Sequence, residues 1–324
     1  MDKMIKLGFV AELDLREENQ NYPVTKKQIQ EYFGPLSEQG LDTYIFSWKS
    51  LTDQGTVNEA YSINEGKTKE LDLSKELDIV FTKQLGNIAN CPQEFLDYLT
   101  YLGNVNTIKV NEPDRMRSNL DKNYLINLQK EGFPVVPTVN VYNRKLEELL
   151  EYDFGIEHED IILKPRIFGE SGNGIVKLSD FKGDEEEFNR YIDQNQPVIA
   201  QPMMKEIFQG EKSLIFLGEE FSHGITKKST TDNYKINISF GTEYARYFPK
   251  QNELEMAHNI IEHYNDQNQM TRIDFLDTKE GPRIMEVERI NPSTYTTQVG
   301  LAHHFCDNLA KFIKRVYTEQ KINY

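Results

Sequence analysis

The chain has 324 residues, which is more than one hydrophobic core usually holds, so two or three packed lobes are expected. Its net charge of −15 argues against a nucleic-acid partner, because phosphate backbones need clustered Lys and Arg, but it leaves room for an anionic nucleotide. No apolar run reaches the roughly 20 residues of a membrane helix, and the N-terminus lacks a signal-peptide cleavage site. Cys91 and Cys306 stand alone, so the sequence predicts a cytoplasmic protein with unpaired thiols and no membrane partner.

Strand and helix alternate in the first third of the chain. Apolar runs predict strands over residues 6–13, 41–48 and 77–85, and helical spacing predicts helices over 23–40 and 92–103. Gly40 is a natural C-terminal stop for the first of these helices. This βαβ order predicts a small doubly wound domain with a parallel sheet.

A second unit begins near residue 110. A helix is predicted over 110–133, and the apolar residues at helical spacing in it are Leu120, Tyr124, Leu125 and Leu128. The elements predicted after it are an extended segment over 134–142, a helix over 144–153, two strands around a Gly-rich turn within 160–178, an apolar segment over 197–207, strands over 213–218 and 221–227, a helix over 254–265, a hairpin over 271–288 and a closing helix over 303–317.

The most specific stretch of the sequence is ILKPRIFGESGNG. Lys164 ends a predicted strand, and Gly169, Gly172 and Gly174 follow in the next loop. Lysine supplies a point charge and glycine lets backbone N–H groups approach phosphate oxygens, so this pattern suits a polyphosphate. It is not a Walker loop, because GxxxxGK[ST] is absent. The alternative is a Gly-rich hairpin turn with a surface lysine.

Three carboxylates fall on the predicted hairpin further along the chain. Glu286 and Glu288 are two apart on one strand, so both project from one face. A symmetric hairpin about residues 278–281 places Asp274 roughly opposite Glu286. Like charges on one face repel unless a cation sits among them, and such oxygen ligands suit Mg²⁺ that shares its shell with phosphates. The alternative is a solvated acidic edge strand.

The order of these features resembles the ATP-grasp superfamily, nearest to bacterial glutathione synthetases and related amino-acid ligases. The features are a lysine on a helix, the strand and loop LKPRIFGESGNG, the segment QPMM, and an aspartate followed by ExE and NPS. The resemblance covers nearly the whole chain and is specific from about residue 78 to 293. It implies an ATP-grasp fold of the α/β class, with α+β lobes and an N-terminal doubly wound parallel-sheet domain. The implied divisions are an N-terminal domain over 1–112, a central lobe over 113–202 and a C-terminal lobe over 203–324.

The resemblance also implies roles for the residues that match the family's positions. Lys122 and Lys164 hold the nucleotide phosphates, and Lys227 faces them. The loop that closes over ATP contains Gly169, Ser171, Gly172 and Gly174. The other implied contacts are adenine recognition at Gln201 to Met204, with Met203 and Met204 beside the base, ribose recognition by Glu211, a position near the phosphates for Asn237, and metal ligation by Asp274, Glu286 and Glu288.

Two departures from the glutathione synthetase pattern point away from glutathione as the product. Those enzymes have Asp-Lys-Arg where this chain has Glu211, Lys212 and Ser213, and they have Glu-x-Asn where it has Glu286 and Glu288. The Glu-x-Glu…Asn-Pro-Ser form is closer to ligases of natural-product pathways, including the cyclo-ligase of cycloserine synthesis.

The implied function is an ATP-dependent carboxylate–amine ligase that forms an amide or peptide bond through an acyl phosphate, with an amino acid or small peptide as substrate. The implied cofactors are ATP and Mg²⁺, with Mn²⁺ as a substitute, and the relatives are often homo-oligomers. The catalytic candidates are Lys164, Lys227 and Arg289, and Arg289 either holds a substrate carboxylate or forms a plain salt bridge. Lys83, at a strand end, is a candidate for contact with substrate or the closed loop. Two other classes stay open: an ATP-grasp phosphotransferase and a non-catalytic ATP-binding module.

Overall fold

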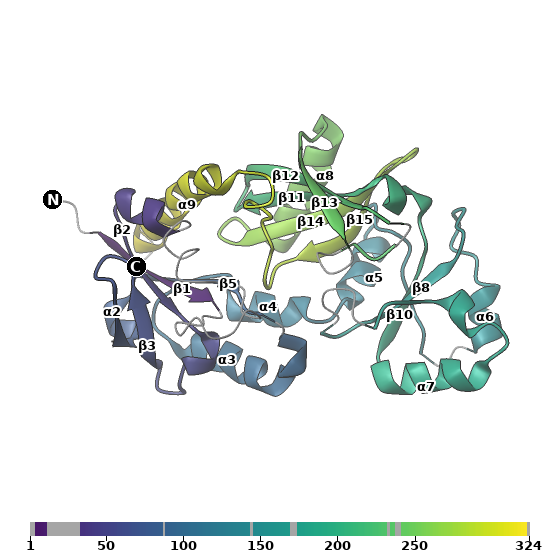
Figure 1. The fold of residues 1–324 in the computed structure, drawn as a ribbon, viewed down its shortest axis with the longest axis horizontal. Helices are drawn as coiled ribbons and strands as arrows, with labels where there is room; N and C mark the ends of the chain where they lie inside the picture. Colours follow the sequence, from purple (N-terminus) through teal and green to yellow (C-terminus); the bar gives the residue numbers. More distant parts are fainter. Residues whose placement is uncertain are drawn as a thin grey trace.

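The structure is a computed structural model, and it describes residues 4–11, 33–86, 88–142, 145–168, 174–231, 234–236 and 241–322. Three β-sheets follow one another along the long axis of the molecule, with helices packed beside them (Figure 1). Within these ranges, every helix is too short or too polar to span a bilayer.

The N-terminal sheet is mixed. Its strand order is β4-β3-β2-β1-β5-β6, and β2, β1, β5 and β6 run parallel. Its strands are β1 (Ile5–Ala11), β2 (Leu41–Phe46), β3 (Thr56–Ser62), β4 (Lys67–Asp72), β5 (Ile79–Gln84) and β6 (Ile108–Val110). Its helices are α2 (Leu73–Glu76), α3 (Pro92–Asn104) and the 3₁₀ turns η1 (Trp48–Ser50) and η2 (Ile88–Asn90). The parallel part of the sheet and α3 confirm the predicted α/β domain.

The sequence prediction missed one hairpin of this domain. The polar stretch after β2 forms the antiparallel strands β3 and β4, joined by a turn that ends at Gly66 with a φ of +67°. An edge hairpin exposes much of its surface, so its apolar signal is weak. Most of the helix predicted over 23–40 lies outside the described residues, but residues 33–38 are helical and Gly40 follows them with a φ of +80°.

The central lobe has a small antiparallel sheet in the order β7-β10-β8-β9. Strands β8 (Ile161–Pro165) and β9 (Val176–Lys177) flank the Gly-rich segment, as predicted. The other two strands are β7 (Val139–Asn140) and β10 (Val198–Pro202). Helices α6 (Leu146–Leu150) and α7 (Glu185–Asn195) and the 3₁₀ turn η3 (Leu178–Phe181) share one hydrophobic core with this sheet.

The helix predicted over 110–133 is two helices, α4 (Pro113–Asn119) and α5 (Asn123–Lys130). At the break, the carboxylate of Asp121 accepts a hydrogen bond from the backbone N–H of Asn123 (2.8 Å). The backbone N–H of Lys122 donates to the carbonyl of Arg166 (2.8 Å), just after β8. In a continuous helix this N–H would bond four residues back along its own axis, so the break joins the helix pair to the central lobe.

The C-terminal sheet is antiparallel, in the order β13-β12-β11-β14-β15. Its strands are β11 (Glu211–Leu217), β12 (Glu220–Ser229), β13 (Thr242–Tyr247), β14 (Met270–Thr278) and β15 (Gly281–Glu288), and the 3₁₀ turn η4 (Lys205–Gln209) precedes β11. Leu214 and Phe216 pack with α8 (Gln251–Tyr264), whereas the alternate residues Ile215 and Leu217 pack with α9 (Ala302–Ile322). Because α9 shares its core with β1, β2 and β5 as well, it joins the first and last sheets (Figure 1). The predicted domain boundaries remain a prediction.

Candidate functional site

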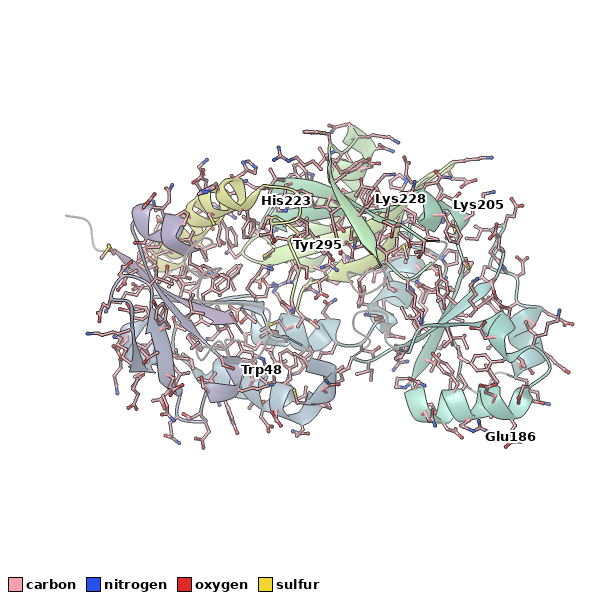
Figure 2. The ribbon with its side chains drawn as sticks, in the orientation of Figure 1. Trp48, Glu186, Lys205, His223, Lys228 and Tyr295 are labelled. Atoms are coloured by element: carbon pink, nitrogen blue, oxygen red, sulfur yellow. The ribbon has the colours of Figure 1, made fainter. Side chains whose placement is uncertain are left out.

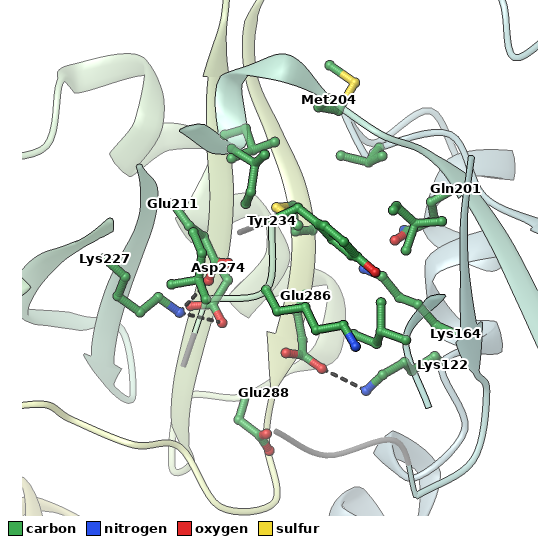
Figure 3. A pocket seen from close by; sticks show the side chains of 18 of the residues that line it. Lys122, Lys164, Gln201, Met204, Glu211, Lys227, Tyr234, Asp274, Glu286 and Glu288 are labelled. Atoms are coloured by element: carbon green, nitrogen blue, oxygen red, sulfur yellow. Dashed lines mark hydrogen bonds and ion pairs between the residues drawn. The ribbon is translucent and has the colours of Figure 1, made fainter. Parts of the chain in front are cut away.

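A cavity of about 310 Å³ lies between the central lobe and the C-terminal sheet, and Gly86 of the N-terminal domain reaches its wall (Figure 3). One end is apolar and is lined from both lobes by Val136, Ile162, Met203, Met204, Ile207, Leu276 and Met285. The other end is charged and is lined by Lys122, Lys164, Glu211, Lys227, Arg272, Asp274, Glu286 and Glu288. An apolar chamber that opens onto clustered charges can hold an organic ring at one end and an anion at the other.

The segment that runs from β10 toward η4 forms one wall of the apolar end. Gln201 is buried, and its side-chain amide donates to the hydroxyl of Thr138 (2.9 Å). The N–H of Met203 donates to the carbonyl of Asp160 (2.7 Å), whereas the N–H of Met204 has no hydrogen-bond partner within the described ranges. An open backbone donor beside an apolar chamber can recognise the edge of a base. The predicted adenine segment therefore lies at the cavity, and Met204 rather than Met203 offers the donor.

Two lysines face the charged end from different segments (Figure 3). Lys122, at the start of α5, forms an ion pair with Glu286 (Nζ–Oε1 2.7 Å). Lys164, in β8, is half-buried and forms no ion pair with the part of the chain that the structure describes. Burial lowers the pKa of Lys164 and the nearby Lys122 adds to the effect, whereas Glu286 opposes it. A partly desolvated cation without a counter-ion is well placed to bind an anion.

A β-bulge sets the register of the carboxylate hairpin. Near the turn the pairs follow a simple hairpin, but the register shifts by one residue just before Asp274 is reached. The extra residue is Met285. Without it Asp274 would pair with Met285, and both glutamates would point to the opposite face. The predicted pairing of Asp274 with Glu286 is confirmed, and the same shift places Glu288 opposite Arg272.

Asp274 is buried among cations. Arg272 donates to both of its carboxylate oxygens (2.8 to 3.0 Å), and the hydroxyl of Ser213 donates to Oδ1 (2.5 Å). Lys227 lies 3.4 Å from Oδ2 and also pairs with Glu211, which faces it on the neighbouring strand. Burial acts to raise the pKa of Asp274, but Arg272 and Lys227 outweigh it, so the pKa is lowered. The cations that offset the charge of Asp274 are therefore protein side chains, Arg272 and Lys227.

Glu286 and Glu288 both line the charged end of the cavity, but their carboxylates have different partners. Glu286 pairs with Lys122, whereas Glu288 Oε1 accepts from two backbone N–H groups of the following turn (2.8 and 3.0 Å). Among the described residues, no group of three or more His, Cys, Asp or Glu side chains is placed to hold a metal ion. The predicted triad of Asp274, Glu286 and Glu288 is thus not preassembled. Mg²⁺ in nucleotide sites takes one or two carboxylates beside phosphate oxygens, so the two glutamates fit it.

Asp274→Asn is expected to lower the free energy of unfolding by about 3 kcal/mol, because Arg272 and Lys227 then stay buried with less opposing charge. The pKa of Asp274 is lowered in the folded protein, so its contribution is full above about pH 4, the ordinary range of an aspartate, and is lost as the pH falls through the lowered pKa. Urea unfolding at neutral and at acid pH measures both effects. Asp277→Asn is the matched control, since Asp277 is partly exposed, pairs with the exposed Lys250 and with Lys212, and should change stability by less than about 1 kcal/mol. Equal stability of Asp274→Asn and wild type at neutral pH would contradict this reading of the network.

Arg289 is held away from the cavity. Its guanidinium pairs with Asp266 (Nε–Oδ2 2.8 Å) and lies over the ring of Tyr264, 4.2 Å from the ring centre. It is not among the described residues that line the cavity. The predicted contact with a substrate carboxylate is corrected to the alternative, a buried salt bridge that secures the turn before β14.

Lys83, at the carboxyl end of β5, is also buried. Its amino group donates to the carbonyl of Pro292 (2.6 Å), in the loop after β15, so it links the N-terminal sheet to that loop. Burial, and then the nearby Arg272, lower the pKa of Lys83 to about 7. Of the described residues near this strand end, Gly86 rather than Lys83 lines the cavity.

Gly174 closes the Gly-rich segment. Its φ is +69°, and a Cβ there would lie 2.6 Å from the side chain of Pro165, so only glycine fits. Its carbonyl accepts a hydrogen bond from the hydroxyl of Tyr191 (2.7 Å). The remaining predicted nucleotide contacts lie outside the described residues and stay predictions: Gly169, Ser171, Gly172 and Asn237.

The cavity-lining residues that were not among the predicted site residues include Tyr234, Arg272 and Tyr295. Tyr295 has a left-handed φ of +52°, and its ring stacks on that of Tyr244 with 5.1 Å between the centroids. The amino group of Lys227 lies 5.3 Å from the centre of the Tyr295 ring. Strand alternation could have found Arg272, which shares a face with Asp274, but no local pattern singles out two of the 17 tyrosines.

A comparison with known protein families matches residues 127–295, just over half of the chain, to the family described as "Prokaryotic glutathione synthetase, ATP-grasp domain". The chain belongs to this family. The match begins within α5 and ends in the loop after β15, so it includes every predicted nucleotide, metal and catalytic residue except Lys122. This ATP-grasp protein is thus an ATP-dependent ligase by family, as predicted. A search of curated proteins found no match.

Solved structures of ATP-grasp ligases share the fold. The D-cycloserine synthetase DcsG is 19% identical over 96% of this chain and 99% of its own, with a TM-score of 0.70. The ligase PsnB, complexed with a phosphomimetic variant of its minimal precursor, Mg and ADP, is 13% identical over 96% and 99%, with a TM-score of 0.63. The macrocyclase MdnC, bound with the precursor peptide MdnA from Microcystis aeruginosa MRC, is 12% identical over 95% and 100%, with a TM-score of 0.62. At these low sequence identities the similarity shows a shared fold and nothing more. The predicted ATP-grasp fold is confirmed.

Proposed function

We propose that this ligase joins a carboxylate to an amine through an acyl phosphate, with an amino acid or a small peptide as substrate. The observation that supports it most is the position of Lys164. It is a half-buried cation with no ion pair among the described residues, and it stands at the charged end of a cavity whose other end is apolar. This arrangement suits ATP with its base in the apolar end and its γ-phosphate among the cations.

The chemistry follows from the leaving group. A free carboxylate does not form an amide readily, because hydroxide leaves poorly. Transfer of the γ-phosphoryl group to the carboxylate oxygen gives an acyl phosphate and ADP. The amine then attacks the carbonyl carbon, the bond from that carbon to the phosphate oxygen breaks, phosphate departs and the new amide nitrogen loses a proton. Lys122, Lys164 and Lys227 are assigned to offsetting the charge on the transferred group, and the Gly-rich loop to excluding water.

The nucleotide contacts are assigned from the two ends of the cavity. Met204 offers its N–H to the base, with Gln201 and Met203 on the same wall. Glu211 is the proposed ribose contact, and its pairing with Lys227 also holds that lysine at the charged end.

Glu286 and Glu288 are the proposed ligands of Mg²⁺, with Mn²⁺ as a substitute. A metal there would offset the negative charge of the phosphates. Asp274 is the third candidate ligand, but its oxygens already accept from Arg272 and Ser213. The PsnB structure contains Mg and ADP together, which supports pairing the metal with the nucleotide on this fold.

The substrate class rests on the relatives and on the departures from the glutathione pattern. PsnB and MdnC are complexed with precursor peptides, and DcsG is a D-cycloserine synthetase. Peptides and amino acids are therefore the proposed partners, and a homo-oligomer is the proposed assembly. ADP release measured with amino acids and dipeptides, alone and in pairs, identifies the acid.

Interception by hydroxylamine tests the acyl phosphate. With ATP, Mg²⁺ and an acid that supports ADP release, hydroxylamine is expected to give a hydroxamate in place of the amide, because it attacks an activated carbonyl. Mass spectrometry of the product measures this, and omission of ATP is the control. A stable phosphate ester formed along with ADP would identify a phosphotransferase instead. ATP binding without ADP release for any acid or pair would favour the non-catalytic module.

A further inference from the structure

An aromatic side chain stands at the apolar end of the cavity. Tyr234 and Ile236, in the segment between β12 and β13, both line the cavity (Figure 3). Both are half-buried and pack against the apolar cluster formed by Val136, Met204, Ile207 and Leu276. A segment of the C-terminal lobe thus adds a ring to the chamber assigned above to the base.

The same ring touches the opposite lobe. The amino group of Lys177, in β9 of the central lobe, lies 5.1 Å from the centre of the Tyr234 ring, a cation–π distance. Burial, and then Asp180 and Asp160 of the central lobe, raise the pKa of Tyr234, so its phenol stays neutral at physiological pH. Tyr234 therefore spans the opening between the two lobes.

The ring borders the chamber without filling it. Ile162 from the central lobe and Met285 from the C-terminal sheet still line the cavity, together with the Met204 segment. Apolar side chains from both lobes thus keep facing open space while Tyr234 forms part of the boundary. A neutral ring at the edge of a chamber of this chemistry can stack on a purine.

We propose that Tyr234 is a nucleotide-binding residue whose ring closes over the adenine base, with Lys177 holding the ring from the other lobe. The inference rests on the proposed placement of ATP in this cavity. It adds a base contact from the β12–β13 segment to the backbone donor at Met204, so the base is held by a hydrogen bond at its edge and by a ring on its face.

Isothermal titration with MgADP and with magnesium tripolyphosphate, which lacks a base, tests the proposal. Tyr234→Ala is expected to raise the Kd for MgADP about tenfold, the range of base–aromatic stacking, and to leave tripolyphosphate binding unchanged. Tyr234→Phe keeps the ring and is expected to bind MgADP within about twofold of wild type. Tyr142→Ala is the matched control, because Tyr142 is 79% exposed and does not line the cavity.

Two results would overturn the proposal. One is a Kd of Tyr234→Ala for MgADP that equals or lies below that of wild type, which would show that the ring does not contribute to nucleotide binding. The other is an equal loss for MgADP and tripolyphosphate, which would place the effect on the fold or the phosphate end. Because neither titration needs an acid or an amine, a chain without ligase activity that still shows the base-specific loss would refute the proposed function and leave this inference standing.

A fluorescent variant gives an independent readout. Tyr234→Trp is expected to bind MgADP like wild type and to change its emission as the nucleotide saturates, because the indole would stack on the base. Trp48 supplies a constant background, since it is buried in the N-terminal domain and donates to the carbonyl of Leu85 (Figure 2). Emission that does not respond to saturating MgADP, while titration shows binding, would count against a base contact.

Discussion

Lys164→Met is expected to lower turnover at least about a hundredfold, which corresponds to about 2.7 kcal/mol of transition-state stabilisation. Methionine keeps most of the bulk of the side chain but removes a positive charge at the cavity that has no ion pair among the described residues. Loss of a half-buried cation that has no ion pair among the described residues does not leave an opposing charge without its partner, so the fold should stay intact. Steady-state ADP release measures turnover, and circular dichroism monitors the fold.

Lys182→Met is the matched control for Lys164→Met. Lys182 is an exposed lysine of the same lobe, outside the cavity, and its replacement should leave ADP release near the wild-type rate. Near-normal turnover of Lys164→Met would instead show that this lysine is an ordinary strand residue beside a hairpin turn.

Glu288→Gln is expected to reduce turnover at least about a hundredfold, because it removes a charged ligand from the cation that offsets the phosphates. The melting temperature without ligand should stay near or above that of wild type. The amide oxygen of glutamine can still accept the two backbone hydrogen bonds that Glu288 Oε1 accepts, so packing is preserved. The rise in melting temperature on adding MgATP should be smaller than in wild type, since a weaker ligand stabilises less at the same concentration.

Glu280→Gln is the matched control, because it removes one negative charge from the same hairpin without removing a proposed metal ligand. Glu280 lies on the same hairpin, exposed at its turn and outside the cavity, so its replacement should preserve both turnover and the MgATP-induced shift. If Glu288→Gln keeps the full MgATP shift and normal turnover, Glu288 is not a metal ligand and belongs to an acidic strand surface.

The linear patterns predicted the parts of the site that lie within single elements. The strand before the Gly-rich segment, the segment at Gln201 to Met204 and the carboxylate hairpin all fall where the sequence placed them. Strand alternation and turn residues are properties of near neighbours in the chain, so a single sequence reveals them. The predicted pairing of Asp274 with Glu286 is confirmed, although it depends on a bulge at Met285 that no sequence pattern predicts.

Two of the candidate residues are long side chains whose partners in the structure lie in other segments of the chain. Arg289 was a candidate for binding a substrate carboxylate, but its guanidinium forms an ion pair with Asp266. Lys83 reaches a carbonyl that is 209 residues away in sequence. A lysine or arginine extends several ångströms from its backbone, so the partner that it finds depends on how whole segments pack.

The sequence by itself determined the fold class, the order of most elements and most of the charged residues that meet at one cavity. It did so because the period of apolar residues and the positions of glycine and proline act locally. Only the tertiary structure decided how these charges are paired: Asp274 with Arg272 and Lys227, Glu286 with Lys122, and Lys164 with none of the described residues. These pairings join the start of α5 to one strand of the C-terminal sheet and link strands within that sheet. Their energies depend on burial and on the distance between segments, which a linear sequence does not contain.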